Sequence, residues 1–318
     1  MDTAERELFA DAVRRAIATS SDGTLDAALD ELGWHDALAA DRRTAVSVLF
    51  EGQGAANVTS AGLDLVLAAA LGQGTGAVAV VLPPLRRWDP PGQMDGDRCR
   101  IEGLATAALA RSGTAIVVCG GGDGATATAV ETRRLECRPV RGLDPALGLV
   151  EVSGDVDATT ALRREPVDWA AAMASGQLAV GHELVGAGRG MLELARTHAL
   201  ERVQFGRPIG AFQAVRHRLA DSLVAIEAAA SLLDAAWDDP SPVTAGMAKA
   251  FAGRSARTVA RHCQQVLAGI GFTTEHPLHR YVRRTLVLDQ LLGAGSVLSH
   301  RLGSDILGRG ALPAAFPL

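Results

Sequence analysis

Hydrophobic residues recur at helical spacing near both ends of the chain. Residues 1 to about 75 carry apolar side chains three to four positions apart. Two glycine-containing stretches, Gly33–Trp34 and Gly52–Gly54, predict breaks between the helices. Residues 168–203 run without proline and predict one helix longer than most. Three further helical stretches follow it, at about 212–233, 243–266 and after His276–Pro277. Together these patterns predict an N-terminal helical region and a C-terminal bundle of four helices.

The middle of the chain shows short apolar runs separated by turns, which is the pattern of β-strands. The strand candidates are residues 77–82, 114–119, 127–130 and 135–140. A glycine cluster at 120–124 predicts a hairpin turn, because neither a P-loop lysine nor Rossmann glycine spacing follows it. We therefore expect three domains: helical over 1–75, β over 76–160, and the four-helix bundle over 161–318.

Composition restricts the class of protein. The chain has 318 residues, of which 48% are hydrophobic and 21% charged, so it should be globular with a sizeable core. Its net charge of -5 gives no general attraction for nucleic acid. The charged first helix is no secretory signal, and glycines and prolines interrupt the most apolar run, 63–84, before it could span a membrane. We expect a cytoplasmic protein that binds neither nucleic acid nor membrane.

The cysteines and histidines predict no metal site. The four cysteines form no C-x-x-C pair, and we expect buried thiols in a reducing compartment at Cys99, Cys119, Cys137 and Cys263. The eight histidines show no H-x-x-x-H or mixed Cys/His spacing. We interpret His182, His198 and His262 as core or surface residues.

One stretch, "ERVQFGRPIGAFQAVRHRLAD" at 201–221, concentrates arginine, glutamine and phenylalanine where the long helix should end. It resembles the R-x-Q-F-G-x-P-I-x-x-F-Q-A-x-x-H-x-L-A-D signature of the FAD-dependent acyl-CoA dehydrogenases. Residues 265–284 are similar to that family's second motif, with Ala268 in place of a glycine and Arg284 in place of an aspartate. Residues 246–251, "GMAKAF", resemble its A-M-A-K-x-F segment.

The resemblance implies an α+β fold of the acyl-CoA dehydrogenase type, with an N-terminal helical domain, a middle β-domain and a C-terminal four-helix bundle. In that family FAD lies across a subunit interface, and one subunit's bundle holds the pyrophosphate and adenosine. A guanidinium at a helix end suits phosphate oxygens, glycine allows close backbone approach, and glutamine both donates and accepts hydrogen bonds. The cofactor-binding residues implied are Arg202, Phe205, Gln213, Gln265 and Gly269.

The catalytic glutamate of the family is missing. Alignment of the second motif places Leu292 at the usual glutamate and Ala294 at the threonine that follows. Some family members carry the base on the first bundle helix instead, and that position is Gly176. Asp289 and Glu183 are nearby carboxylates whose plain interpretation is a solvated charge or a helix-face residue; a relocated base at either stays an alternative. Because a general base contributes about 10²–10⁴-fold to a rate, its loss matters.

The residues that contact the flavin ring in the family are also replaced. The hydroxyl-bearing A-L-T-E-P element aligns with Val80–Val81–Leu82–Pro83, and the F/W-I-T/S-N element aligns with Ala107–Ala108–Leu109–Ala110. Both hydroxyls and the amide have become apolar groups that cannot hydrogen-bond the ring.

These features predict a subunit of a heteromeric FAD-dependent acyl-CoA dehydrogenase that is inactive alone. The partner would be a full-length homologue that supplies the glutamate, the ring pocket and most contacts to the acyl-CoA. The resemblance extends to the α2β2 enzymes of actinobacterial steroid degradation, which implies a steroid-derived CoA thioester as substrate. Two alternatives stay open: a homo-oligomeric dehydrogenase with a displaced base, Asp289 first, or a non-catalytic interaction module with the family fold.

Overall fold

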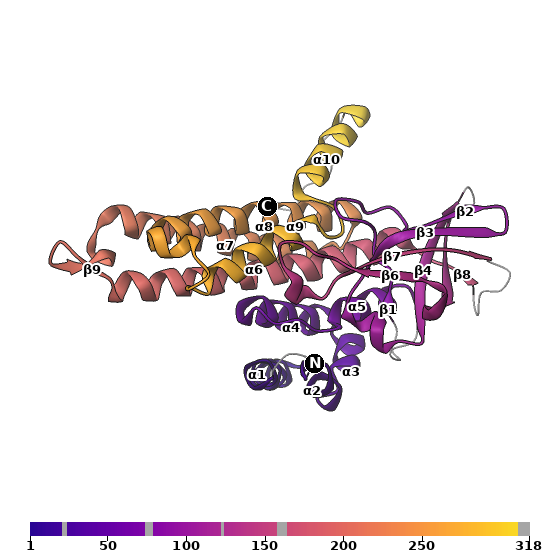
Figure 1. Ribbon diagram of the computed structural model, residues 1–318, viewed down its shortest axis with the longest axis horizontal. Helices are drawn as coiled ribbons and strands as arrows, with labels where there is room; N and C mark the ends of the chain where they lie inside the picture. Colours follow the sequence, from indigo (N-terminus) through magenta and orange to yellow (C-terminus); the bar gives the residue numbers. More distant parts are fainter. Residues whose placement is uncertain (21–23, 74–78, 122–123, 158–163, 311–318) are drawn as a thin grey trace.

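The computed structural model describes residues 1–20, 24–73, 79–121, 124–157 and 164–310. Helices form both ends of the chain and a mixed sheet lies between them in sequence (Figure 1). The main hydrophobic core runs through the N-terminal helices, the bundle and the near face of the sheet. A second, smaller core lies on the other side of the sheet. This α+β arrangement confirms the predicted fold class.

The N-terminal helices begin with side-chain caps. The Asp2 carboxylate accepts a hydrogen bond from the Glu5 N–H at 2.9 Å, and the Glu5 carboxylate accepts one from the Asp2 N–H at 2.8 Å. The predicted break at Gly33 is present, with φ of 68°, whereas the break predicted at 52–54 is wrong because that helix continues to Ala56. The helices of this region are α1 (Thr3–Thr19), α2 (Leu25–Glu31), α3 (Trp34–Ala40), α4 (Arg42–Ala56) and α5 (Gly62–Ala70).

The strands pair in the order β6-β7-β3-β2-β4-β5-β8, and β1 adds to β4. Neighbours are antiparallel except that β1 and β2 run parallel to β4. Side chains alternate between the two faces of the sheet along the first half of β3, so that Cys99 and Ile101 are buried while Arg98 and Arg100 are exposed. The strands are β1 (Ala79–Val80), β2 (Gly92–Asp95), β3 (Arg98–Ala105), β4 (Thr114–Gly121), β5 (Gly124–Glu131), β6 (Glu136–Pro139), β7 (Val150–Asp157) and β8 (Arg164–Pro166).

The predicted strands at 114–119, 127–130 and 135–140 are confirmed by β4, β5 and β6. Of the predicted strand 77–82, only its centre is β1, and residues 77 and 78 lie outside the described residues. The glycine cluster joins neighbouring antiparallel strands, since Gly121 pairs with Gly124. Strands β2, β3, β7 and β8 were not predicted.

The C-terminal part contains four helices that pack together and a fifth that leaves them. The packed helices are α6 (Trp169–Glu201), α7 (Gln213–Asp238), α8 (Pro242–Leu267) and α9 (Leu278–Gln290). Helix α10 (Gly295–Arg309) packs on α8 near its first turns and then projects away from the body (Figure 1). Helix α8 begins at a capping box between Ser241 and Thr244, with Pro242 in its first turn.

Glycines bring α4 and α6 into close contact. A Cβ atom added at Gly186 would lie 2.8 Å from the Cα of Glu51, and one added at Gly54 would lie 2.9 Å from the backbone nitrogen of Ala187. Because the obstructing atoms are backbone, neither helix could yield by rotating a side chain. The contact fixes the N-terminal helices against the bundle.

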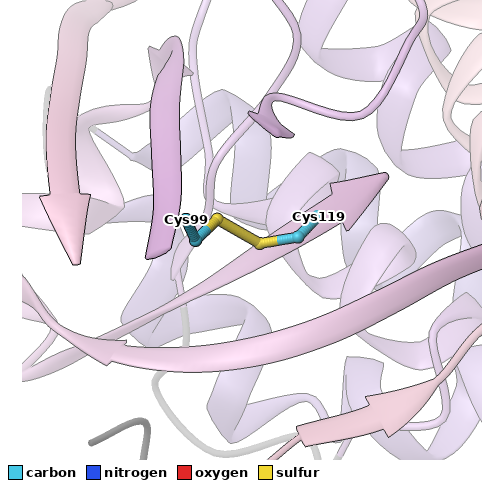
Figure 2. Close-up of a disulfide and its surroundings, with 2 residues drawn as sticks. All are labelled: Cys99 and Cys119. Atoms are coloured by element: carbon cyan, nitrogen blue, oxygen red, sulfur yellow. A yellow bond between two sulfur atoms is a disulfide. The ribbon is translucent and has the colours of Figure 1, made fainter. Parts of the chain in front are cut away.

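The expectation of four buried cysteine thiols is wrong for three of them. Cys99 and Cys119 form a disulfide bond (Figure 2), and Cys137 is exposed on β6. Only Cys263 is a buried thiol as predicted, and burial raises its pKa to about 12. Within the described ranges no helix is long and apolar enough to cross a membrane, and no cluster of His, Cys, Asp or Glu could hold a metal ion.

Candidate functional site

The long helix α6 ends in a short hairpin at the far end of the bundle (Figure 1). Arg202 caps α6, its N–H donating to the His198 carbonyl at 2.9 Å. Strands β9 (Val203–Gln204) and β10 (Arg207–Pro208) then pair, with Phe205 and Gly206 between them. Both turn residues have positive φ, 52° and 77°, as two-residue hairpins require.

Phe205 is an unusual residue for this turn. Its side chain is 91% exposed, and a left-handed backbone is unfavourable for an aromatic residue with a Cβ atom. Its ring meets the Phe212 ring edge to face, with 6.1 Å between centroids. An exposed aromatic ring on a strained backbone contributes little to the fold, and such residues cluster at ligand clamps.

Two arginines flank this turn without acidic partners. In the part of the chain that the structure describes, neither Arg202 nor Arg207 forms an ion pair, although both are exposed. The Arg207 guanidinium lies 4.3 Å above the Phe212 ring, which orients it. Partial burial and the nearby Arg202 charge lower the pKa of His198. An anion with several oxygens, such as a phosphate, fits this pair of unpaired cations.

The second motif lies at the same end of the bundle. It runs from the last turn of α8 through the 3₁₀ helix η6 (Ala268–Phe272) into α9, and its His276 ring lies 6.4 Å from the His198 ring. Gln265 and Gly269 are exposed, and a Cβ added at Gly269 would meet nothing within 4 Å. Gln213 is also exposed, in the first turn of α7. The five residues predicted to bind a cofactor are therefore all exposed at one end of the bundle, which we call the bundle tip.

The two positions that the resemblance aligns with the family's base meet inside the core. Leu292 is fully buried, and a Cβ added at Gly176 would lie 2.7 Å from the Leu292 Cδ1 and 2.9 Å from the Leu67 Cδ2. No carboxylate occupies either position, and the Leu292 side chain fills the space over Gly176. This contact could not be seen in the sequence, where the two residues are far apart.

Two polar side chains hold the junction between α9 and α10, in which Leu292 lies. The Gln177 amide donates to the Leu292 carbonyl at 2.9 Å. The Lys249 ammonium donates to the Asp289 carbonyl at 2.7 Å and to the Gly293 carbonyl. Burial lowers the pKa of Lys249 to about 7, and the Asp289 charge opposes this shift. Sequence reasoning did not assign either residue a role; lysine within "GMAKAF" was the available signal.

Asp289 and Glu183 are not the solvated charges that the sequence suggested. Asp289 is 4% exposed and forms an ion pair with Arg257 at 2.5 Å. Glu183 is 5% exposed; it accepts from the Gln53 amide at 2.8 Å and lies 3.8 Å from Arg284. Burial raises the pKa of Glu183, and the Arg284 charge opposes the shift. Both carboxylates are tied into the packing of α6, α8 and α9.

Of the two elements aligned with the flavin-ring contacts, Val80–Pro83 is buried, whereas Ala107 and Ala110 of the second are exposed. Val80, Val81 and Leu82 are fully buried, and the Leu82 backbone pairs with Leu104. The carboxylate of Asp64 accepts the Val80 N–H at 2.9 Å and the Thr106 hydroxyl at 2.6 Å. Burial raises the pKa of Asp64 to about 6. The Val80 N–H and the Thr106 hydroxyl are therefore satisfied within the chain and are not free to hydrogen-bond a flavin ring.

A cavity of about 550 Å³ lies between α6, α8, α10 and the loop before β2. Its walls are mainly apolar, with charged residues among them; they include Trp88, Trp169, Met247, Phe251, Leu298 and Arg257. Neither Leu292 nor any residue of the bundle tip lines it. The tip and this cavity are therefore separate features.

Comparisons with known proteins agree with this fold. Residues 169–307 match the family described as acyl-CoA dehydrogenase, C-terminal domain. The chain is similar to acyl-CoA dehydrogenase IpdE2 of Mycobacterium tuberculosis, with 35% identity over 175 residues, which are 54% of this chain and 52% of that protein. The matched segment thus spans about half the length of that relative.

Two solved structures share the fold along nearly the whole chain. The ChsE4-ChsE5 complex from Mycobacterium tuberculosis gives a TM-score of 0.75 at 21% identity, covering 96% of this chain and 98% of that chain. The Tcur3481-Tcur3483 steroid ACAD gives 0.74 at 24% identity, covering 96% of each chain.

Proposed function

We propose that this chain, in which residues 169–307 match the acyl-CoA dehydrogenase C-terminal domain family, is one subunit of a heteromeric FAD-dependent acyl-CoA dehydrogenase. One observation carries the proposal: an open bundle tip suited to a phosphate-bearing ligand coexists with a base position filled by Leu292. A chain that kept the first feature and lost the second serves an active site whose remainder lies in another subunit.

Each residue of the tip has a role in this proposal. Arg202 donates charge-assisted hydrogen bonds to the pyrophosphate, and Phe205 packs on the cofactor. Gly269 lets the backbone approach the phosphates, while Gln213 and Gln265 contact the adenosine side. The bound FAD supplies the hydride acceptor. The partner, a full-length homologue in an α2β2 assembly, supplies the carboxylate that removes the α-proton, the ring pocket and most of the acyl-CoA contacts.

The substrate class is proposed from the relatives. The Tcur3481-Tcur3483 protein, which shares the fold, is a steroid ACAD, and ChsE4-ChsE5 is a complex of two proteins. We therefore propose α,β-desaturation of a steroid-derived CoA thioester. A homo-oligomeric enzyme with Asp289 as the base is disfavoured, because Asp289 is buried and bound to Arg257.

The test is the flavin content of the purified protein, alone and co-expressed with a full-length homologue. We expect one FAD for each pair of subunits in the complex and none with the chain alone. Arg202→Ala should weaken FAD binding by about 10- to 100-fold, because a hydrogen bond to a charged group contributes roughly 1.5–3 kcal/mol. Phe205→Ala should also weaken it without lowering the Tm, since the ring is 91% exposed.

Arg196→Ala is the matched control, because Arg196 is exposed near the end of the same helix but pairs with Glu193. Equal flavin retention in the Arg202 and Arg196 variants would contradict the cofactor role and favour a non-catalytic interaction module. A chain that purifies alone with FAD, and whose flavin is reduced by an acyl-CoA, would contradict the split site.

A further inference from the structure

The disulfide between Cys99 and Cys119 joins two strands that are not neighbours (Figure 2). Cys99 lies on β3 and Cys119 on β4, and β2 pairs with both strands. The bond passes Gly92, where an added Cβ would lie 2.7 Å from the Cys119 sulfur and 2.8 Å from the Cys99 sulfur. Glycine at the first position of β2 leaves the space that the two sulfurs occupy.

This bond crosses the weakest pairing of β2. Strand β2 pairs with β3 through four residue pairs, but it meets β4 through only two, Gly92 with Cys119 and Gln93 with Gly120. That second pairing is also parallel, and parallel pairs are slightly less stable per residue than antiparallel ones. With the disulfide formed, β3 and β4 stay joined even when the β2–β4 hydrogen bonds open.

The chain just before β2 connects the sheet to the bundle. We call residues 83–91 the Trp88 loop. The Trp88 carbonyl accepts the Trp169 indole N–H at 2.8 Å, and the Arg301 guanidinium of α10 lies 4.9 Å from the centre of the Trp88 ring. The Arg86 N–H donates to the Gln290 carbonyl at 2.8 Å, at the end of α9. The loop thus contacts α6, α9 and α10.

The loop also rests on the strand that carries Cys119. A Cβ added at Gly120 would lie 3.3 Å from the Pro90 ring, and the Glu102 N–H of β3 donates to the Pro91 carbonyl at 2.9 Å. Both strands joined by the disulfide therefore contact the last residues of the Trp88 loop. A looser connection between β3 and β4 should therefore loosen these loop residues.

We propose that Cys99 and Cys119 are a reversible oxidation site whose disulfide secures the Trp88 loop between the sheet and the α9–α10 junction. The co-reactant is a low-molecular-weight disulfide such as oxidised glutathione. The two cysteine thiols lose two electrons and two protons to it, so that one protein disulfide forms and two small thiols leave. Both cysteines are at most 2% exposed, so exchange occurs when the β2–β4 pairing opens locally.

The first experiment counts thiols in the intact chain. The protein is incubated with oxidised glutathione, denatured without reductant and alkylated with iodoacetamide, and mass spectrometry then reads the modified residues. We expect Cys99 and Cys119 to be alkylated only after prior reduction, whereas buried Cys263 is alkylated without it and exposed Cys137 carries either a carbamidomethyl group or glutathione. Alkylation of Cys99 and Cys119 without prior reduction would overturn the proposal.

The second experiment measures trypsin cleavage after Arg86 and Arg87, which are exposed in the Trp88 loop. Reduction with dithiothreitol should speed this cleavage by roughly tenfold, because cleavage follows the population of the locally open form. Cleavage after Arg133 and Arg134, exposed on the turn before β6, should not change. Cys99→Ala should cleave like the reduced protein and Cys137→Ser like the oxidised one. Equal cleavage of the oxidised and reduced wild type would overturn the proposed effect on the loop.

Discussion

The contact between Leu292 and Gly176 predicts a coupling that can be measured. Leu292→Ala removes three buried carbon atoms and should destabilise the chain by about 2–5 kcal/mol. Gly176→Ala places a methyl group 2.7 Å from the Leu292 Cδ1 and 2.9 Å from the Leu67 Cδ2. That overpacking costs about 1–3 kcal/mol and is partly offset by about 1 kcal/mol of helix propensity.

In the double variant the added methyl enters space that the shortened residue 292 has vacated. The clash with Leu292 disappears and part of the cavity is filled, while the contact with Leu67 persists. The double variant should therefore be more stable than the sum of the single effects predicts, by about 1–2 kcal/mol. Neither change alters the left-handed backbone at position 292, where φ is 53°.

The assay is urea unfolding of the four proteins followed by tryptophan fluorescence, with ΔΔG values compared at matched slopes. Independent sites add within about 0.3–0.5 kcal/mol. Additivity within that limit would show that residues 176 and 292 do not touch. It would then contradict the inference that the two positions aligned with the base converge in the core.

Two further predictions concern the scaffold. Gly186→Ala should destabilise the chain by about 3 kcal/mol or more, because its Cβ meets the α4 backbone. The control is Gly188→Ala, whose Cβ would lie 3.2 Å from an Ile226 side-chain carbon and which should be near neutral. Thermal unfolding measures both effects. Burial lowers the pKa of Lys249 from 10.5 to about 7, so at a pH between these two values the unfolded chain binds a proton that the folded chain lacks. The free energy of unfolding of the wild type should therefore rise with pH across this window, relative to that of Lys249→Met. A constant difference in free energy between the two proteins would contradict this.

Local patterns in the sequence predicted the long helices and the strands of continuous apolar character. Helix α6 was predicted to within two residues at each end because proline is absent and glycines alone do not stop a helix. Strands β3 and β7 were missed because charged residues, glycine and aspartate break their apolar runs. Their period-two alternation, as in Val150, Val152 and Val156, was the signal available.

Contacts between distant residues could not be predicted in this way. The disulfide depends on how β3 and β4 flank β2, and spacing in the sequence does not define such pairing. Buried charges were misjudged for a related reason: Asp289 looks like a surface residue until Arg257 of α8 is placed beside it. Arg284, which departs from the family's aspartate, is fully buried and is balanced by Asp144 at 2.7 Å and Glu183 at 3.8 Å.

If the proposed function is correct, the α9–α10 junction explains how a chain can lose a catalytic side chain and keep the surrounding structure. Gln177 and Lys249 donate to the carbonyl groups of residues 289, 292 and 293, and backbone carbonyls are the same whatever side chain position 292 carries. The side chain at 292 faces Gly176 and Leu67 instead. A leucine there gains apolar burial in that space, whereas an ionised glutamate would lose its solvation on entering it. Under the proposed function, loss of the base and closure of its pocket are therefore one packing change that leaves the bundle tip untouched.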